Sequence, residues 1–478
     1  MSQEKKSISA GLIWSVLEKF VVTGTQLLFS IIIARQLSPD DYGIIAMFSV
    51  FISISQCLID AGFTDALIQK QDRSESDYAT VFYFNVLVAV ILYVVLFVLA
   101  PNIARFYNQP ILEQVTRISG VVLIIQALYS IQIARIQIYR TFKTQTIISF
   151  ISAIISGVIA IVLVRRGLGI WTLVFQTIIN YTVNCIGLWV AGKWRPVVFF
   201  SVGSFRELFG FGYKIMIGGL IHYIYTNLYT LIIGKFYKSS DLGYFNRANS
   251  LSQMPSISIS TVLIRVFYPA ECELQDDDDA LTEAYFRYLR VCFFVISPLM
   301  LGLCAVSDTL IRVLLTEKWV GCVLYLQILC FAYMWEPAMM LTWSLLNAKH
   351  RSDLSLKSEI LKKVAAFILL IISAPLGVTA LCFSLVAYSL IDILIVSLFT
   401  RRLLPRVTFW GIIRNIFPIL SASALMALFV YLIHFISING VIKLSLSILS
   451  GVLLYYVLCR VFGIRELQLI ISKIKRHD

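Results

Sequence analysis

The sequence contains few charged residues for its length. Asp, Glu, Lys and Arg make up 14% of the 478 residues, whereas soluble domains carry about 25%. Hydrophobic residues reach 59%, the mean hydropathy is +0.84, and the excess extends along the whole chain. Because a helix needs about 20 apolar residues to cross the hydrocarbon, this composition argues against a soluble globular protein and predicts many membrane spans.

Motifs for metal binding, covalent catalysis and nucleotide hydrolysis are also missing. The nine cysteines occur singly, without a Cys-x-x-Cys pair or a Cys/His cluster, which argues against zinc, iron–sulfur and disulfide frameworks. No G-x-x-x-x-G-K-[ST] loop is present, so the chain is not expected to be an ATP-driven pump by itself. Without H-E-x-x-H, G-x-S-x-G or kinase signatures, we expect no catalytic residue, no metal site and no cofactor.

The apolar runs predict an all-α membrane protein with about fourteen transmembrane helices. The first run is too long for a signal-peptide core, so we expect an uncleaved first span. The polar connections between the runs are short, and none is large enough for a soluble domain. The runs fall at roughly 10–33, 43–67, 79–100, 116–134, 146–164, 168–191, 212–233, 243–268, 288–306, 321–346, 360–375, 377–400, 411–436 and 441–462.

Positive charges divide unevenly between the two sides of the membrane. With a cytoplasmic N-terminus, 27 of the 40 Lys and Arg residues fall on the inner side, nine on the outer side and four within or at the edges of spans. Lys357, Lys362 and Lys363 are counted on the inner side. Cytoplasmic loops carry the excess of Lys and Arg, so both termini are predicted to be cytoplasmic. The net charge of +13 then reflects topology and lipid contact, and nucleic-acid binding is not expected.

Two parts of the chain resemble each other. Residues 32–43 match 232–243, offset by 200, through the pattern Ile-Ile-small-basic followed by Asp-x-Gly. Residues 167–175 match 375–383, offset by 208. The offset spans an even number of predicted helices, so the two halves share one orientation. Parallel repeats of this kind build transporters whose substrate site lies between two lobes.

The repeat predicts three parts of the chain. An N-terminal lobe, 1–203, would contain spans 1 to 6, and a C-terminal lobe, 204–402, would contain spans 7 to 12. Residues 403–478 lie outside the repeat, and we expect them to form spans 13 and 14 and a cytoplasmic tail.

Polar residues inside the spans are the candidate functional residues. A charge at the membrane centre costs about 2.5–3.5 kcal/mol on insertion scales, although helix–helix hydrogen bonds or snorkelling also account for such residues. Around Arg247 most of a helical turn is polar, which lipid would not tolerate. The candidates for a substrate cavity are Glu18, Lys19, Gln26, Asp60, Arg117, His222, Asn246, Arg247, Asn249 and Gln253. The candidates for ion coupling are Asp60, Glu336 and Asp392.

Two stretches carry more specific motifs. The first contains Trp14-Ser15-x-x-Glu18-Lys19-Phe20, Ile33-Ala34-Arg35-x-Leu37-Ser38-Pro39-x-Asp41-Tyr42-Gly43 and Leu58-Ile59-Asp60-Ala61-Gly62-Phe63. The second contains Leu242-Gly243-Tyr244-Phe245-Asn246-Arg247-Ala248 and Arg265-Val266-x-x-Pro269-Ala270. Both resemble bacterial polysaccharide-biosynthesis flippases of the Wzx type, within the multidrug/oligosaccharidyl-lipid/polysaccharide exporter superfamily.

This resemblance implies two six-helix lobes in a V-shaped arrangement, with two C-terminal helices appended, that work by alternating access. It implies translocation of a polyprenyl-diphosphate-linked oligosaccharide, such as an O-antigen, capsule or exopolysaccharide repeat unit, across the bacterial cytoplasmic (inner) membrane. Membrane lipids and other polysaccharide-assembly proteins would be its partners. By motif, Glu18, Arg35, Asp60 and Arg247 occupy positions typical of that family.

Three alternatives stay open. An ion-coupled multidrug antiporter of the same superfamily would use carboxylates such as Asp60, Glu336 and Asp392 and would favour an acidic cavity. A membrane-embedded glycosyltransferase would form glycosidic bonds, but the short loops argue against it. A scaffold for envelope assembly would tolerate the loss of every charge within the spans.

Overall fold

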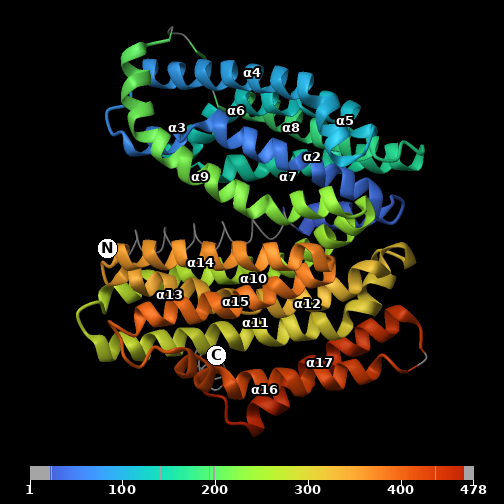
Figure 1. Ribbon diagram of the computed structural model, residues 1–478, viewed down its shortest axis with the longest axis vertical. Helices are drawn as coiled ribbons and strands as arrows, with labels where there is room; N and C mark the ends of the chain where they lie inside the picture. Colours follow the sequence, from blue (N-terminus) through green and yellow to red (C-terminus); the bar gives the residue numbers. More distant parts are fainter. Residues whose placement is uncertain are drawn as a thin grey trace. The chain divides into compact units, whose positions relative to one another are not determined.

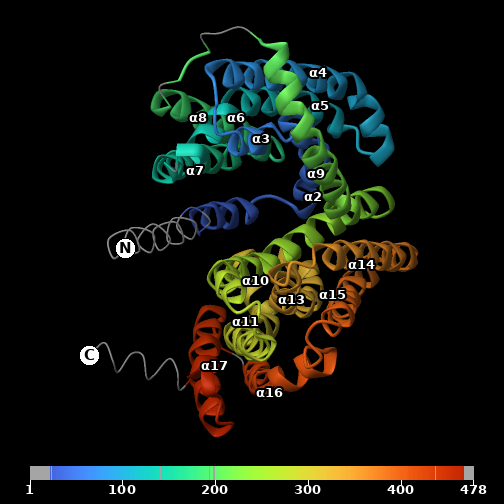
Figure 2. The ribbon, with the colours of Figure 1, turned by 90° about the vertical axis from the view of Figure 1, so that its left-hand side faces the viewer.

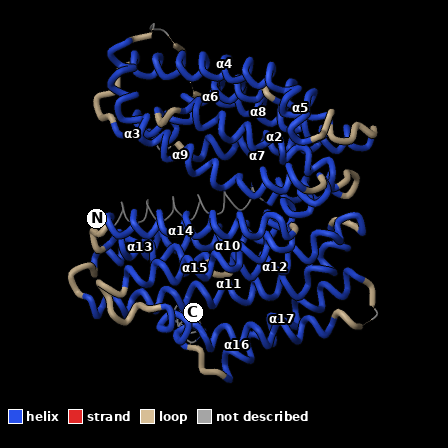
Figure 3. The backbone as a smooth tube through the Cα atoms, in the orientation of Figure 1, coloured by secondary structure: helices blue, strands red, loops and turns tan. Residues whose placement is uncertain are grey.

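A computed structural model describes residues 22, 24–139, 141–192, 194–196, 200–436 and 438–467. Every regular element in this part of the chain is a helix, as Figure 3 shows. The chain divides into two compact units, Met1–Gly243 and Tyr244–Asp478. Within each unit the helices lie side by side along a common direction (Figure 1). The predicted all-α class is therefore confirmed.

The first unit contains the helices that precede the second repeat motif. Residues 24–34 are helical. Further along the chain a long helix ends at residue 60, and a short helix follows it after a break. The helices are α2 (Pro39–Asp60), α3 (Phe63–Gln69), α4 (Glu75–Tyr107), α5 (Ile111–Ser119), α6 (Val121–Tyr139), α7 (Phe142–Arg165), α8 (Trp171–Ala191) and α9 (Val202–Phe236).

The second unit begins inside a long polar helix and ends with a helical hairpin. Its elements are α10 (Ser239–Glu273), whose first turns belong to the first unit, α11 (Asp278–Leu314), η1 (Glu317–Cys322), α12 (Val323–Tyr333), α13 (Glu336–Ala348), α14 (Ser352–Ser373), η2 (Ala374–Leu376), α15 (Val378–Thr400), α16 (Phe409–Ile433) and α17 (Gly440–Val461). The hairpin of α16 and α17 packs on α11, as Figure 2 shows.

A helix lies at each predicted span from the second to the fourteenth. Eleven segments among the described residues are long and apolar enough to cross a membrane. The helices α10 and α14 are not among them, because both carry many charged and hydroxyl side chains. Most of the first predicted span, 10–33, lies outside the described residues. The structure therefore shows a protein with many membrane spans, but it does not confirm a count of fourteen.

Serine caps explain why several helices begin before their apolar runs. Ser38 accepts a hydrogen bond from the backbone N–H of Asp41, and the Asp41 carboxylate accepts one from the backbone of Ser38. Ser74 and Asp77 form the same reciprocal pair at the start of α4. Each pair satisfies two backbone donors that the first helical turn leaves unpaired. The helices consequently extend into polar sequence beyond the predicted boundaries.

The long helix α9 packs on α2, α3 and α4 of the first unit. The predicted lobe boundary, between 203 and 204, would instead place this helix in the second lobe. The packing thus associates α9 with the elements that precede it in sequence. The division of the chain into two lobes and a C-terminal part, at 1–203, 204–402 and 403–478, stays a prediction.

The two repeat motifs meet at the beginnings of α2 and α10. A Cβ atom added to Gly43 would lie 1.8 Å from the carbonyl oxygen of Ser239, and one added to Gly243 would lie 1.9 Å from that of Pro39. Ser239 also donates its hydroxyl to Asp40 at 2.6 Å. Each repeat therefore supplies one glycine that allows the backbone of the other to approach closely. The Asp-x-Gly motifs are matched in space as well as in sequence.

Candidate functional site

The first unit encloses a polar cavity of about 370 Å³ between α2, α3, α6 and α9. Carboxylate, amide and hydroxyl groups line it together with two aromatic rings and several small or apolar side chains. The lining residues are Gln56, Cys57, Ile59, Asp60, Gly62, Thr64, Asp65, Gln126, Ala127, Tyr129, Ser130, Ile133, Ile215, Met216, Gly219 and Tyr223. Among these residues there is no Lys or Arg, so the cavity has an acidic character.

A break between α2 and α3 forms one end of this cavity. Asp60 is the last residue of α2, and Ala61 and Gly62 follow with φ of 47° and 72° in the left-handed region. The chain therefore bends at Asp60-Ala61-Gly62. Only a residue without a side chain fits at Gly62, because an added Cβ would lie 2.3 Å from the carbonyl oxygen of Gly212 on α9.

The break leaves the Asp60 carboxylate near the negative end of a helix dipole. Thr64 donates its hydroxyl to Asp60 Oδ1 at 2.5 Å, which fixes the carboxylate against the first turn of α3. A carboxylate at the C-terminal end of an interrupted helix attracts cations and hydrogen-bond donors. Interrupted helices supply such sites in membrane transporters.

Amide groups on α2 and α6 also line the cavity. Gln56 donates from Nε2 to the hydroxyl of Tyr181 at 3.3 Å. The side-chain oxygen of Gln126 is buried and has no hydrogen-bond partner in the described part of the chain. An unpaired buried acceptor is unfavourable by about 1–3 kcal/mol. A ligand that donates a hydroxyl would supply the missing hydrogen bond at this position.

The cavity can accommodate neutral polar ligands such as sugar hydroxyls, or a small cation beside the carboxylates. A group of three or more His, Cys, Asp or Glu side chains that could hold a metal ion does not occur among the described residues. Tyr223 is exposed on α9 and adds an aromatic face to the lining. Mixed polar and aromatic walls are typical of sites that orient a small organic ligand.

The predicted cavity residues outside α10 lie in different places. Glu18 and Lys19 lie outside the described residues, and Gln26 is exposed on the helix 24–34. Arg117 pairs with Glu113 at 2.8 Å, and its guanidinium lies 4.9 Å from the centre of the Phe97 ring. His222 is exposed on α9, next to the cavity residue Tyr223. Of this group, only Asp60 lines the cavity itself.

The predicted residues of α10 lie within the second unit. Arg247 is 9% exposed, and its guanidinium carbon lies 5.6 Å from the centre of the Trp319 ring. Asn249 accepts a hydrogen bond from the hydroxyl of Tyr333 at 2.6 Å. The amide nitrogen of Asn246 is buried without a hydrogen-bond partner among the described residues, whereas Gln253 is half-buried. Their contact with a substrate stays a prediction.

The two predicted coupling carboxylates of the second unit lie on helices that pack on each other. Glu336 at the start of α13 interacts electrostatically with Asp392 in the middle of α15. Both also interact with Lys362 of α14. The charge count assigned Lys362 to the inner side, but the structure places this side chain inside α14 with 6% exposure. The helix α14 begins ten residues before Lys362 and packs on α15, and the inner-side assignment of Lys362 stays a prediction.

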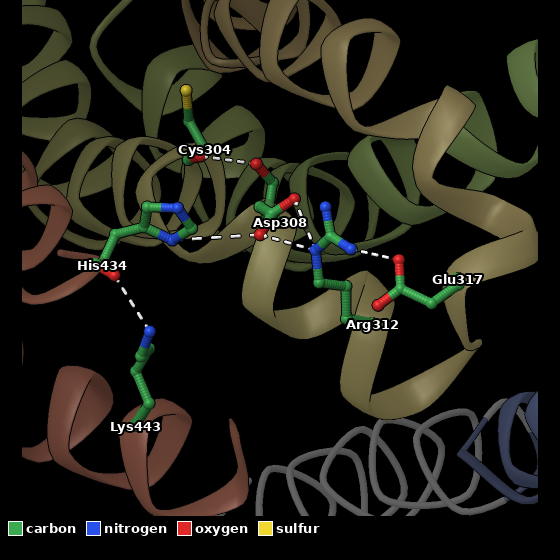
Figure 4. A network of polar contacts seen from close by, with 7 residues as sticks. Cys304, Asp308, Arg312, Glu317, His434 and Lys443 are labelled. Carbon is green, nitrogen blue, oxygen red and sulfur yellow. Dashed lines mark hydrogen bonds and ion pairs between the residues drawn. The ribbon is translucent and has the colours of Figure 1, made fainter. Parts of the chain in front are cut away.

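A polar network at the opposite end of the second unit fixes the C-terminal hairpin. Figure 4 shows Asp308 of α11 between Arg312 and His434, the residue that follows α16. Arg312 Nε lies 3.0 Å from both carboxylate oxygens of Asp308, and His434 Nδ1 lies 3.9 Å from one of them. Lys443 of α17 donates to the backbone oxygen of His434 at 2.9 Å. These contacts connect α16 and α17 to α11.

Several site residues were not among the predicted ones. Gln56 and Gln126 line the cavity. In the second unit, Lys362 forms ion pairs with both Asp392 and Glu359. Gln56 precedes Asp60 by four residues, and this spacing places both on one face of a helix. That signal could have found Gln56. No sequence signal connects Gln126 or Lys362 to its partners, because they lie on other helices.

Comparisons with known proteins relate the chain to proteins of polysaccharide biosynthesis. Residues 32–324 match a family model described as "Polysaccharide biosynthesis protein". The lipopolysaccharide biosynthesis protein WzxC of Escherichia coli is 26% identical over 372 residues, which cover 76% of this chain and 74% of the relative. The teichuronic acid biosynthesis protein TuaB of Bacillus subtilis is 26% identical over 353 residues, covering 73% of each chain.

Solved structures share the fold. The lipid II flippase MurJ in an inward closed conformation matches with a TM-score of 0.74 at 15% identity, covering 94% of this chain and 98% of that one. An inward-facing multidrug resistance transporter of the MATE family matches with a TM-score of 0.62 at 13% identity, covering 80% and 95%. At these identities the matches show the fold alone.

Proposed function

Because this chain belongs to the family of polysaccharide biosynthesis proteins, we propose that it translocates a polyprenyl-diphosphate-linked oligosaccharide across the bacterial cytoplasmic membrane by alternating access. The observation that carries the proposal is the family match from 32 to 324, which includes both Asp-x-Gly repeat motifs. One relative is named a succinoglycan biosynthesis transport protein, which supports a role in transport. Other polysaccharide-assembly proteins are proposed as partners.

The proposed orientation places both termini in the cytoplasm. It rests on the 27 to nine division of Lys and Arg between the two sides, since the excess of these residues marks cytoplasmic loops. In this orientation the break between α2 and α3 lies toward the inner side. The cavity would then be open to a substrate that is assembled in the cytoplasm.

A flippase must supply hydrogen-bonding groups that replace the water around the sugar. Moving an unpaired hydroxyl into hydrocarbon costs several kcal/mol, and an oligosaccharide carries many. We propose that Gln56, Asp60 and Gln126 bind sugar hydroxyls, while the lipid tail stays in the bilayer. The acidic lining does not suit a diphosphate, which needs cationic groups. Lys19, Arg117 and Arg247 remain the proposed candidates for that part of the substrate.

Replacing Asp60 or Gln126 tests the cavity. Purified protein in liposomes would be given a fluorescent polyprenyl-diphosphate-linked disaccharide, and an impermeant quencher would measure its appearance in the other leaflet. Asp60→Asn should slow translocation roughly tenfold, since one hydrogen bond to a charged group is worth about 1.5 kcal/mol. Gln126→Leu should slow it less, because its amide is neutral.

Asp72→Asn serves as the matched control, because this carboxylate is exposed in the loop before α4. It should translocate at the wild-type rate. Wild-type rates in both cavity variants would show that the cavity takes no part in translocation. A wild-type protein that moves no lipid-linked sugar would contradict the function itself.

Ion-coupled export of cationic drugs is the second candidate. The acidic lining with Asp60 and Asp65 favours it, because carboxylates attract cationic organic molecules. Expression in a strain sensitive to cationic dyes distinguishes the two functions. Resistance that is conferred by the wild type and lost in Asp60→Asn would support drug export, whereas unchanged sensitivity would support the flippase.

A further inference from the structure

Three helices of the second unit bring together a cluster of charged side chains, of which Lys362 and Asp392 are buried. The helices α13, α14 and α15 pack on one another and lie side by side in Figure 2. Lys362 Nζ lies 2.8 Å from Glu359 Oε2 and 3.3 Å from Asp392 Oδ2. The side chains of Lys362 and Asp392 are only 7% and 5% exposed. This ion pair is therefore screened from solvent and from lipid headgroups.

The charges in this cluster do not balance. Lys363 pairs with Glu359 at 3.2 Å, and Glu336 interacts with both Asp392 and Lys362. Three carboxylates thus face two ammonium groups, and one negative charge is left over when all are ionised. An uncompensated charge inside a membrane protein is strongly unfavourable. The cluster therefore favours the uptake of one additional positive charge.

One buried oxygen marks the position for this charge. Asp392 Oδ1 is buried and has no hydrogen-bond partner among the described residues. Tyr388, one turn earlier on α15, and the groups of α14 are the neighbours that interact with this carboxylate. The helix α12 also packs on α15, and its sequence contains no charged residue. A hydrogen on Oδ1 would remove the excess negative charge from the cluster.

The cluster lies well inside its helices. With a rise of about 1.5 Å per residue, Glu336 lies roughly 18 Å from the end of α13, and Lys362 roughly 15 Å from the start of α14. By the same rise, Asp392 lies roughly 12 Å from the end of α15. In the predicted topology these three helix ends are on the inner side, so the three groups lie at similar depths within their spans. Titratable groups at such positions mark proton sites in membrane proteins.

We propose that Glu336, Lys362 and Asp392 form a proton-binding site within the second unit. A proton arriving from water at the half-buried Glu336 is transferred to Asp392, whose carboxylate becomes a neutral acid. Lys362 stays an ammonium group and retains its ion pair with Glu359. Release restores the carboxylate and returns the proton to water. No electron or other group is transferred.

A proton fits this cluster better than a metal ion. A metal would need several oxygen ligands around a central space, but the Lys362 ammonium already lies between Glu359 and Asp392. A set of three or more His, Cys, Asp or Glu side chains arranged for a metal ion was not found within the described ranges. If the proposed function holds, proton release to one side and uptake from the other would drive the translocation cycle.

Infrared titration of the full-length protein in lipid tests the site without any substrate. A protonated buried carboxyl gives a carbonyl-stretching band that an ionised carboxylate lacks. The wild-type spectrum minus that of the Glu336→Gln/Asp392→Asn variant should contain such a band, which disappears as the pH is raised. The difference cancels the contribution of Glu271, which is also fully buried. Lys362→Met should retain the band to higher pH, because the ammonium no longer favours the ionised form.

Asp308→Asn is the matched control, because this carboxylate pairs with Arg312 at the other end of the second unit. The wild-type spectrum minus that of the control should lack a band that titrates together with the cluster. If the double variant folds poorly, Glu336→Gln alone is compared, because Glu336 is half-buried and Gln has the same shape. A difference spectrum without a titrating band would overturn the proposal. Failure of the flippase assay would leave this outcome unaffected, since no substrate is added.

Discussion

At the scale of single residues, the structure separates polar groups that stabilise the fold from polar groups that need a ligand. The Glu466 side chain is 4% exposed, but Arg290 donates from Nε to its Oε1 at 2.7 Å. Asp392 Oδ1 and Gln126 Oε1 are buried without such partners among the described residues. Because native proteins satisfy most buried polar atoms, the second kind indicates function.

Lys70 is expected to stabilise the fold through its ion pairs. Its ammonium lies 2.9 Å from Asp77 and 2.9 Å from Glu207, so it connects the start of α4 to α9. Burial alone would lower the pKa of Lys70, but the hydrogen bonds with Glu207 and Asp77 outweigh it and raise that pKa. The ammonium group is therefore charged throughout the ordinary lysine range, and at alkaline pH the ion pairs are lost as the pH rises through the raised value.

Replacing Lys70 by Met should lower the free energy of unfolding by about 1–3 kcal/mol, because the buried Asp77 loses a partner. Thermal unfolding of the purified protein in detergent measures this change near neutral pH. Lys70→Arg is the control and should remain close to the wild type. Equal melting temperatures for Lys70→Met and Lys70→Arg would show that the ion pair contributes nothing.

At the scale of helices, the close contact between the starts of α2 and α10 connects the two repeats. Gly43 and Gly243 allow the backbones to approach, and Ser239 adds a hydrogen bond to Asp40. The repeat in the sequence predicted that these motifs correspond to each other. It did not predict that they touch, because the order of residues does not specify which helices become neighbours.

Replacing Gly243 by Val should disturb this contact. The new Cβ would lie 1.9 Å from the carbonyl oxygen of Pro39, so the two helices must separate, at a cost of about 1–3 kcal/mol. We expect a lower melting temperature and slower translocation in liposomes. Gly218→Val is the control, because a Cβ there would meet nothing within 4 Å. Identical behaviour of the two variants would exclude the close contact.

At the scale of the whole molecule, the distribution of charge predicts orientation. The 27 to nine division of Lys and Arg predicts that both termini are cytoplasmic. Fusing a reporter that fluoresces only in the cytoplasm to either end tests this prediction. Both fusions should fluoresce, and a fusion inserted after Lys238, in the short connection between α9 and α10, should not. Fluorescence at only one terminus would require an odd number of spans.

The sequence by itself determined the class of the molecule and the positions of its helices. Apolar runs of sufficient length can satisfy their backbone hydrogen bonds only as helices inside a membrane, so thirteen predicted spans coincide with helices. The family also followed from local motifs. Asp60 was predicted because an acidic residue within an apolar run can be recognised from the sequence alone.

Only the tertiary structure decided which polar groups share a site. Lys362 looked like one of many basic residues beside a span, yet the packing of α14 on α15 buries it against Asp392. Gln126 gained significance only because α6 faces Asp60 across a cavity. The rotation and neighbours of each helix depend on side-chain packing between segments far apart in the chain, and hydropathy along one segment does not contain that information.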